Sequence, residues 1–294
     1  MKALVNVPHP EAVHSIRIML ESVGFEVVRE RDRSAEYVVQ SLVYEPYEMK
    51  SVATPDFDLY VHVKPEQLKS PGLLFFINGG NRGENDFGVP TVTSNFYFEK
   101  AFRTYVPYFN RHGLKPRGKR ESFGRPMGLL HGGKGWGYMR YFPLLSPYVD
   151  IWGASCPQGI LPQMCVKEKL EKALCFVHLK SNDAPGYALY EAFASGAPII
   201  VPRFFVENCK FQELFVDGET CLMFDNDDAK ANKETDEEKR KVVEQILGLI
   251  ERLRDPEENY RIGMNGLFKW RELTRWTPEK RDKFAEYLKQ NSLL

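Results

Sequence analysis

Short apolar runs alternate with polar or glycine-rich turns and helical stretches along most of this chain, and this alternation constrains the fold more than any other feature. Residues 2–7 (KALVNV) predict a strand. Residues 11–23 carry an apolar side chain at every third or fourth position, which predicts a helix, and Gly24 ends it. Residues 25–28 begin the next strand. Strands that alternate with helices form a mostly parallel sheet covered by helices, so the sequence predicts an α/β protein.

The same alternation continues through two successive units. The first half contains further predicted strands at residues 58–63, 72–77 and 90–94. The second unit begins near residue 125, with predicted strands at 126–132, 149–153, 175–180, 197–202 and 221–225, and predicted helices near 162–174, from 186, and through Glu213–Phe215. Two doubly wound units place a ligand where the carboxyl ends of their sheets face a shared cleft.

A basic segment marks the predicted boundary between the units. Residues 111–125 contain six Lys or Arg residues and one acidic residue, which predicts a solvated hinge. The charge density also leaves open contact with an anionic acceptor, including nucleic acid. We expect a small N-terminal, acceptor-side Rossmann-like domain at residues 1–115 and a donor domain at 116–276. A C-terminal helix at 277–294 is expected to pack back on the N-terminal domain.

The charges of the 294 residues balance, with 40 Lys and Arg against 40 Asp and Glu. This balance argues against a protein whose whole surface binds nucleic acid or an anionic membrane. No apolar stretch approaches the length of a transmembrane anchor, and the N-terminus predicts a strand rather than a signal peptide. The five cysteines form no CxxC pair, which favours reduced thiols and a cytoplasmic protein. The sequence is also compatible with a compact viral or phage protein that acts in the host cytoplasm.

The most informative segment is residues 180–202, KSNDAPGYALYEAFASGAPIIVP. A strand ends near its start, Gly186 opens a helix, and Gly196 ends that helix. Asp183 in the loop and Glu191 in the helix lie about 12 Å apart along a helical path of roughly 1.5 Å per residue. This spacing suits the two ends of an extended ligand such as a nucleotide-sugar, with the free N–H groups of the first turn directed at a phosphate. The alternative is an ordinary strand–loop–helix unit with solvated acids.

The run from Asp183 to Pro198 resembles the signature of the family-4 retaining glycosyltransferases of GT-B fold. That signature is an acid, seven residues, a Glu, and then Ala-x-Ala-x-Gly-x-Pro. Residues 213–220 (ELFVDGET) resemble the family's segment before its last sheet strand, and Lys134-Gly135 is similar to the Lys-Gly that begins its donor domain. The resemblance covers residues 126–285. It implies a GT-B fold, with two Rossmann-like, doubly wound domains that face a cleft and a small N-terminal domain.

The resemblance also implies a role for each matching residue. Asp183 takes the position of the first acid, near the hydroxyls of the transferred sugar. Glu191 takes that of the second acid, which accepts hydrogen bonds from ribose hydroxyls. Lys134 would neutralise the diphosphate leaving group. The residues expected to bind the donor are His131, Gly133, Lys134, Gly135, Gly186, Tyr187 and Glu213.

Three departures from the family pattern stand out. The first acid, Asp183, is one methylene shorter than the usual Glu. Cys221 replaces a glycine. The Arg that normally precedes the Lys-Gly pair is missing, and Arg140 or Arg203 are the candidates to replace it.

Several shorter motifs are weaker indications of a functional site, and each has a simpler structural explanation. Residues 131–137 (HGGKGWG) suit a phosphate-facing loop, although they are no Walker A motif and a ligand-free glycine turn is the alternative. His9, in the first strand–helix loop, is a candidate catalytic base, and a solvated histidine is the alternative. The DxD-like pairs Asp56/Asp58 and Asp225/Asp227 are expected to be solvated acids, so we expect no metal site. His62 is expected to be a core histidine, although its strand could bring it to the cleft. Other candidates for acceptor or donor-sugar contact are Asn78–Asn81 and Ser94-Asn95.

The sequence therefore predicts a metal-independent hexosyltransferase that requires no cofactor and takes a UDP- or GDP-sugar as donor, with retention implied by the resemblance. The expected acceptor is a glycan, a lipid-linked sugar or, as the weaker alternative, nucleic acid. Two other functions stay open. One is a nucleotide-sugar epimerase or hydrolase of the same fold, and the other is a non-catalytic nucleotide-sugar-binding subunit.

Overall fold

The computed structural model of the chain divides into two compact units. The first comprises Met1–Phe109 and Thr274–Leu294, and the second comprises Asn110–Asn182 and Tyr187–Leu273. The residues that the structure describes are 2–6, 10–28, 37–41, 43–45, 48–50, 73–77, 90–93, 101–108, 110, 113–129, 140–153, 156–159, 161, 163–179, 187–208, 211–226 and 234–294. Within these residues, no helix is both long enough and apolar enough to cross a membrane.

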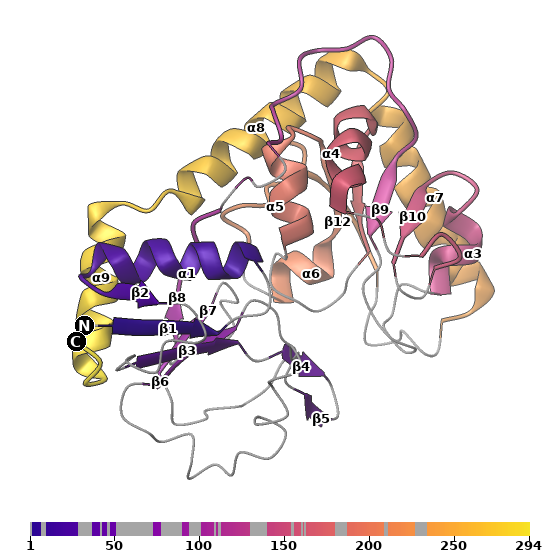
Figure 1. Cartoon of the computed structure of the whole chain (residues 1–294). Helices are drawn as coiled ribbons and strands as arrows, with labels where there is room; N and C mark the ends of the chain where they lie inside the picture. Colours follow the sequence, from indigo (N-terminus) through magenta and orange to yellow (C-terminus); the bar gives the residue numbers. More distant parts are fainter. Residues whose placement is uncertain are drawn as a thin grey trace. The chain divides into compact units, whose positions relative to one another are not determined.

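The first unit is built on a parallel sheet of six strands in the order β2-β1-β3-β6-β7-β8 (Figure 1). The strands are β1 (Lys2–Asn6), β2 (Glu26–Val28), β3 (Tyr37–Ser41), β6 (Leu73–Ile77), β7 (Thr91–Thr93) and β8 (Phe102–Arg103). A separate antiparallel pair is formed by β4 (Val43–Glu45) and β5 (Glu48–Lys50). Because β1 lies between β2 and β3, the chain leaves β1 toward one edge of the sheet and later crosses to the other side.

Helix α1 (Pro10–Ser22) covers β1 and β2. It begins at a proline, which suits the first helical position because the missing N–H has no partner there. Ile16 and Leu20 are buried on its inner face, as the apolar spacing predicts. Gly24, at φ +92°, ends the turn in the left-handed region that glycine adopts without strain. The chain can therefore turn directly into β2.

The C-terminal helix α9 (Pro278–Gln290) belongs to the first unit, although it is far away in the sequence. Trp276, just before the helix, donates its indole N–H to the hydroxyl of Ser22 at 2.9 Å. The hydroxyl of Tyr287 donates to the carbonyl oxygen of Thr91 and accepts from the N–H of the same residue. Tyr287 thus satisfies both backbone groups of a β7 residue at the start of that strand.

The second unit has a parallel sheet of five strands in the order β10-β9-β11-β12-β13. The strands are β9 (Met127–Leu129), β10 (Asp150–Trp152), β11 (Phe176–His178), β12 (Ile199–Pro202) and β13 (Leu222–Phe224). Phe176 lies at the centre, opposite Met127 on one side and Ile199 on the other. Every residue of β11 and β12 is buried, as expected for strands with both faces covered by helices.

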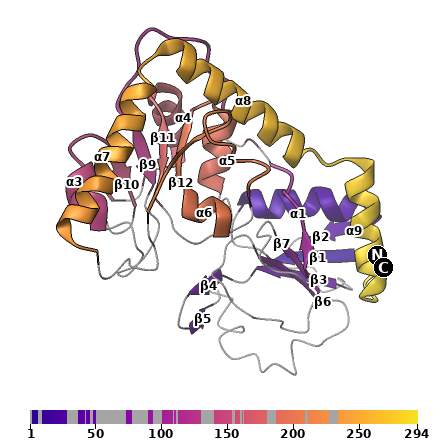
Figure 2. The same ribbon diagram turned by 180° about the vertical axis from the view of Figure 1, so that it is seen from behind.

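Helices cover both faces of this sheet. They are α3 (Phe142–Leu145), α4 (Gln163–Lys172), α5 (Tyr187–Ala194), α6 (Arg203–Asn208), α7 (Asp236–Arg252) and α8 (Pro256–Thr274). Helix α7 packs on β12, β13 and α3, and Figure 2 shows it on the opposite side of the sheet from α4 and α5. Helices α4 and α5 connect β10 to β11 and β11 to β12, in the same direction across the sheet, so right-handed crossovers place both on one face. Helix α3 connects β9 to β10 in the opposite direction, which places it on the other face, where it contacts α7.

The structure corrects two sequence predictions. Glu213 lies in a turn rather than in a helix; the helix after β12 is α6, which ends at Asn208. The described part of the basic segment, residues 113–125, belongs to the second unit rather than linking the two units, although most of its residues are exposed, as the sequence predicts. The predicted strand at 58–63 lies outside the described residues, whereas β3 and β8 are strands that the sequence analysis did not predict.

Helix α8 packs so closely on the rest of the second unit that only glycine fits at two positions. A Cβ atom added to Gly263 would overlap the carbonyl oxygen of Gly196, and one added to Gly266 would lie 2.7 Å from the carbonyl oxygen of Thr220. Both obstacles are backbone atoms, which cannot rotate away. Gly248 on α7, by contrast, has no atom within 4 Å of an added Cβ.

These two environments predict opposite effects of the same substitution. Gly263→Ala should lower the free energy of unfolding by about 1–3 kcal/mol or more, because the backbone must shift to relieve the overlap. Gly248→Ala should raise it by about 0.5–1 kcal/mol, because alanine restricts the unfolded chain and favours the helix. Urea unfolding of the two variants measures the difference. Equal effects would mean that α8 does not pack this closely.

Candidate functional site

The carboxyl edge of the second sheet is the place where the topology favours a ligand. β9 and β11 are neighbours, but the chain leaves β9 toward β10 on one side and leaves β11 toward β12 on the other. Open parallel sheets bind ligands outside the carboxyl ends of the strands at such a switch point. Residues with polar groups at this edge include Trp152 in β10, His178 in β11, Arg203 after β12, and Asp225 and Asn226 after β13.

Glu191 is a buried acid in the helix that follows β11. It is the single charged residue of α5 (YALYEAFA), and its exposed fraction is 6%. A carboxylate removed from water costs free energy unless the protein or a ligand supplies polar partners. The interpretation of Glu191 as an ordinary solvated helix acid is therefore wrong.

Aromatic packing holds α5 in place around Glu191. Tyr187, in the first turn, is buried, and its ring meets that of Tyr190 edge to face at 6.0 Å. The ring of Tyr190 also packs against Trp270 of α8, with centroids 5.9 Å apart. Both tyrosines lie in the turn that precedes Glu191, so their packing fixes the rotation of this part of α5 against the core.

Glu213 is placed differently from the other described candidates. It lies in a turn, its side chain is 62% exposed, and its carboxylate is 4.0 Å from the ammonium group of Lys269. Its neighbours Leu214 and Phe215 are buried and anchor the turn. The structure thus presents Glu213 at the surface, whereas Glu191 is enclosed.

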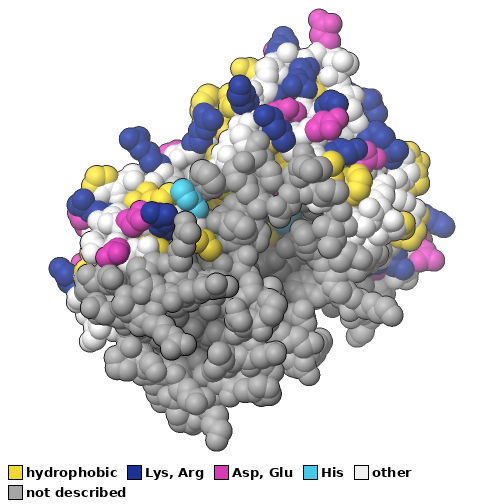
Figure 3. Space-filling model, in the orientation of Figure 1, with side chains coloured by type: hydrophobic (Ala, Val, Ile, Leu, Met, Phe, Trp, Pro, Cys, Tyr) yellow, Lys and Arg dark blue, Asp and Glu magenta, His cyan; other side chains and the backbone are white. Residues whose placement is uncertain are grey.

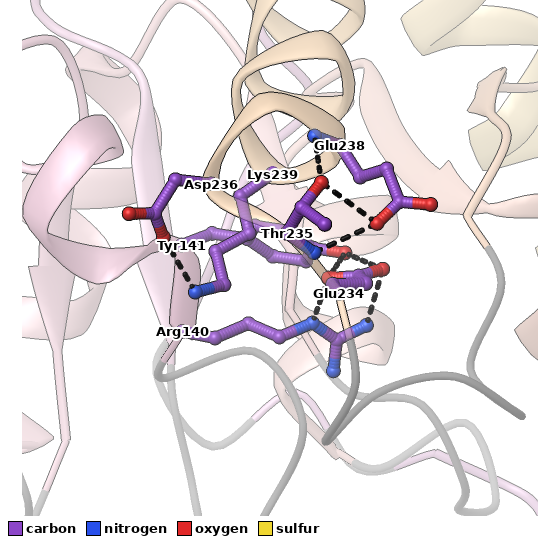
Figure 4. Close-up of polar contacts among 7 residues, drawn as sticks. All are labelled: Arg140, Tyr141, Glu234, Thr235, Asp236, Glu238 and Lys239. Carbon is purple, nitrogen blue, oxygen red and sulfur yellow. Dashed lines mark hydrogen bonds and ion pairs between the residues drawn. The ribbon is translucent and has the colours of Figure 1, made fainter.

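The two arginines considered as replacements for the missing family Arg are both bound to carboxylates. Arg140 donates from Nε to Oε2 of Glu234 at 2.6 Å and from Nη2 to Oε1 at 3.3 Å (Figure 4). Burial lowers the pKa of Arg140, but the hydrogen bond and charge of Glu234 outweigh it, so the pKa is raised above its ordinary value. Arg203 pairs with Asp225 at 2.8 Å and Asp217 at 3.0 Å, and these hydrogen bonds raise its pKa.

Glu234 is a residue that the sequence analysis missed. It accepts hydrogen bonds from Arg140 and from the hydroxyl of Tyr141, at 2.9 and 3.0 Å to its two oxygens. Burial is the main cause that raises the pKa of Tyr141 above its ordinary value. The sequence offers no signal for this cluster, because Glu234 lies within a strongly charged stretch, residues 225–240, that predicts a solvated loop and the start of a helix.

Several predicted residues lie outside the described part of the chain. These are His9, His131, Gly133, Lys134, Gly135, Asp183 and Gly186 of the main site, and His62, Asn78–Asn81, Ser94-Asn95, Asp56, Asp58 and Asp227 among the weaker signals. The described strands show which strand each of three of these segments follows in the chain. His9 follows β1, residues 130–139 follow β9, and residues 180–186 separate β11 from α5.

The structure explains one departure from the family pattern. Cys221 is buried at the start of β13, and its carbonyl oxygen accepts a hydrogen bond from Gly218 at 2.9 Å. Burial is the main cause that raises the pKa of its thiol above the ordinary value. Cys221 is therefore a core residue, at the position that matches a glycine in the family pattern that the sequence resembles.

The basic segment is anchored to the second unit by Arg117, whose exposed fraction is 4%. The Nη1 group of Arg117 donates to the carbonyl oxygen of Ala173 at 2.7 Å, and burial lowers its pKa to about 10. Its backbone N–H donates to the carbonyl oxygen of Ser195 at 2.9 Å. Arg117 thus satisfies a carbonyl group just after α4, where the helix has no further backbone donors.

Two other basic residues of this segment are paired with acids on the surface. Lys119 pairs with Glu257, and Arg125 lies 3.2 Å from Asp150. Figure 3 shows Lys and Arg side chains interspersed with Asp and Glu on the described surface. The described part of the segment therefore forms no uniformly positive surface for an anionic acceptor.

Comparisons with known proteins identify the fold. No protein-family model matches the chain, and no curated protein matches it significantly. Solved structures do match over the whole length. A mutant of T4 phage BGT in complex with UDP-glucose aligns over 100% of both chains, with a TM-score of 0.55 and 12% identity.

Two further structures give the same result. Anabaena HepE in complex with UDP-glucose covers 99% of this chain and 100% of its own, with a TM-score of 0.54 and 10% identity. A glycosyltransferase from Rickettsia africae covers 98% and 97%, with a TM-score of 0.53 and 10% identity. The predicted GT-B fold class is confirmed, whereas membership of family 4 stays a prediction.

The buried position of Arg117 leads to a stability prediction. Arg117→Ala should lower the free energy of unfolding by about 1–3 kcal/mol or more, because the buried carbonyl oxygen of Ala173 loses its donor. Lys115→Ala, at an exposed neighbouring position, should change it by no more than about 0.5 kcal/mol. Chemical denaturation of both variants gives the comparison. If both substitutions change the free energy of unfolding by a similarly small amount, the buried hydrogen bonds of Arg117 do not stabilise the fold.

Proposed function

We propose that this chain is a glycosyltransferase that transfers a hexose or similar sugar from a UDP- or GDP-sugar to an acceptor, with retention and without a metal ion. The observation that carries the proposal is the buried carboxylate of Glu191 in α5, on the connection that follows β11 at the switch point of the second sheet. The GT-B fold supports the proposal, because proteins of that fold have been crystallised with UDP-glucose.

The two acids have different roles in this proposal. Glu191 accepts hydrogen bonds from the ribose hydroxyls, and such hydrogen bonds to a charged acceptor are stronger than those to a neutral one. Asp183, eight residues earlier, lies beside the transferred sugar, where positive charge develops at the anomeric carbon. His9 contributes a base on the acceptor side. The remaining donor contacts are proposed for His131, Gly133, Lys134, Gly135, Gly186, Tyr187 and Glu213.

The diphosphate leaving group needs fixed positive charge, because negative charge develops on it as the glycosidic bond breaks. Lys134 supplies that charge in the proposal. In the proposal, residues 1–115 form the domain that binds the acceptor, and residues 116–276 form the domain that binds the donor. The helix at 277–294 packs on the N-terminal domain. A glycan or lipid-linked sugar is the proposed acceptor class, and the paired basic segment gives no support to nucleic acid.

One observation favours a second function. Arg140 and Arg203, the candidates for the missing phosphate-binding Arg, are each held by carboxylates. A chain with too little positive charge at the diphosphate would bind a nucleotide-sugar without transferring the sugar. The second candidate is therefore a non-catalytic nucleotide-sugar-binding subunit.

Release of nucleoside diphosphate on addition of an acceptor tests the proposed function, and substitution of the two acids tests its chemistry. Glu191→Gln should mainly raise the donor KM, because ribose hydroxyls do not change charge during transfer. Asp183→Asn should keep nucleotide binding and lower kcat by about 10²-fold, or about 2.7 kcal/mol. Glu272→Gln, at an exposed position on α8, is the matched control and should leave both constants unchanged.

The outcomes separate the candidates. Asn caps a helix as well as Asp, so near-normal turnover of Asp183→Asn would reduce Asp183 to a helix cap. Release without any acceptor would indicate a hydrolase. Donor binding without release on a panel of glycan and lipid-linked acceptors would indicate the binding subunit.

A further inference from the structure

Exposed apolar and aromatic side chains gather on and beside helix α8 (Figure 1). Among the described residues, four large side chains of this kind are exposed, and two of them, Tyr260 and Phe268, lie on α8. A third, Val216, lies in a turn that contacts the helix, because Arg261 donates to the carbonyl oxygen of Gly218 in that turn at 3.0 Å. Phe268 is the most exposed of the four, at 58%. Single exposed apolar residues are common on protein surfaces, whereas such a gathering indicates a contact surface.

The outward face of α8 is defined by residues that recur every three or four positions and therefore share one side of the helix. They are Glu257, Tyr260, Arg261, Met264, Phe268, Arg271 and Glu272. All are exposed except Met264, which is half-buried. On the inner side, Gly263 and Gly266 pack against backbone atoms of the second unit, so α8 presents this face on a rigid element.

The order of residues on the outward face is complementary to itself in the antiparallel direction. Three pairs have a midpoint within half a residue of position 266: Arg261 with Glu272, Tyr260 with Arg271, and Met264 with Phe268. The first pair joins opposite charges, the second places a guanidinium group against an aromatic ring, and the third joins apolar side chains. A single antiparallel arrangement of two α8 helices therefore brings all three pairs together.

The geometry of a helix also keeps these pairs on matching sides. At 3.6 residues per turn, Arg261 and Glu272 lie on one flank of the outward face, and Tyr260 and Arg271 lie on the other. In a two-fold symmetric contact the same surface is used by both subunits, so each flank meets the same flank of the partner. The contacts that the charged pair makes within the chain oppose this little: Arg261 is 3.3 Å from Glu258 and Glu272 is 3.4 Å from Lys269, and exposed ion pairs of this kind contribute little.

We propose that the outward face of α8 is the interface of a symmetric homodimer, in which two α8 helices pack antiparallel and cross near residue 266. The occupant of the face is a second copy of this chain, because the face complements its own charges and rings. One helix pair buries less area than the roughly 1,600 Å² of a standard interface, so the dimer is weak. The inference concerns a surface of the second unit and does not depend on the proposed function.

Sedimentation equilibrium of the full chain, from about 1 to about 500 μM, tests the proposal. We expect the mass to rise with concentration from that of one chain towards that of two. Phe268→Ser should raise the dissociation constant by about tenfold or more, because the symmetric pair contains this apolar contact twice. Tyr148→Ser is the matched control: Tyr148 is 54% exposed between α3 and β10, and its loss should leave the dissociation constant unchanged.

Charge reversal tests the antiparallel order itself. Arg261→Glu and Glu272→Arg each place like charges opposite one another twice, so each should raise the dissociation constant by about tenfold. The double variant Arg261→Glu/Glu272→Arg restores opposite charges in reversed order, and its dissociation constant should return to within about threefold of the wild-type value. Thermal unfolding at about 1 μM, where the chain is monomeric, shows that each variant is folded.

Two results would overturn the proposal. One is a wild-type chain that stays monomeric at about 500 μM, or that binds vesicles of phosphatidylcholine and phosphatidylglycerol through Phe268 without dimerising, because the face would then be a membrane contact. The other is a double variant that dimerises as weakly as the two single variants, because the antiparallel pairing of Arg261 with the partner's Glu272 would then be absent.

Discussion

The parallel pairing of β9 with β11 determines where this chain can place a ligand. These strands are 49 residues apart at Met127 and Phe176, and their backbone hydrogen bonds bring together two connections that run in opposite directions along the sheet. Right-handed crossovers then put α4 and α5 on one face, and α7, which follows the last strand, lies on the other. The carboxyl ends of the two strands are left between these connections, with the segments that carry Lys134 and Asp183 attached to them.

Buried charge is the second recurring feature of this unit. Arg117 donates to a backbone carbonyl oxygen beside α4, Arg140 pairs with Glu234, and Glu191 lies inside α5. Each removes a charged group from water, which is costly unless polar partners compensate. Arg117 closes a helix end, so its role is structural. Glu191 lies on a connection from the carboxyl edge, which is why the donor proposal rests on it.

The parts of the fold that the sequence predicted well are those fixed by local rules. Helix α1 follows from apolar spacing and ends at Gly24, which adopts the positive φ that the motif requires. The strands of the second unit follow from continuous apolar runs. Contacts between residues that are distant in the sequence could not be predicted from local patterns. Arg117 is buried against carbonyl groups of residues 53–57 positions away, and Glu234 binds Arg140, which is 94 positions away. Their charges predicted solvated loops, because a charged residue is normally exposed.

Hydrogen exchange with and without a nucleotide-sugar tests the central claim, that the donor binds at the carboxyl edge beside α5. The first N–H groups of an α-helix have no acceptor in the helix's own backbone ladder, so the amides at the start of α5 should respond directly to a bound phosphate or sugar. The account predicts that UDP-glucose or a GDP-sugar slows exchange there, while the middle of α7 is unchanged. Protection confined to other elements, or no protection by either donor, would contradict it.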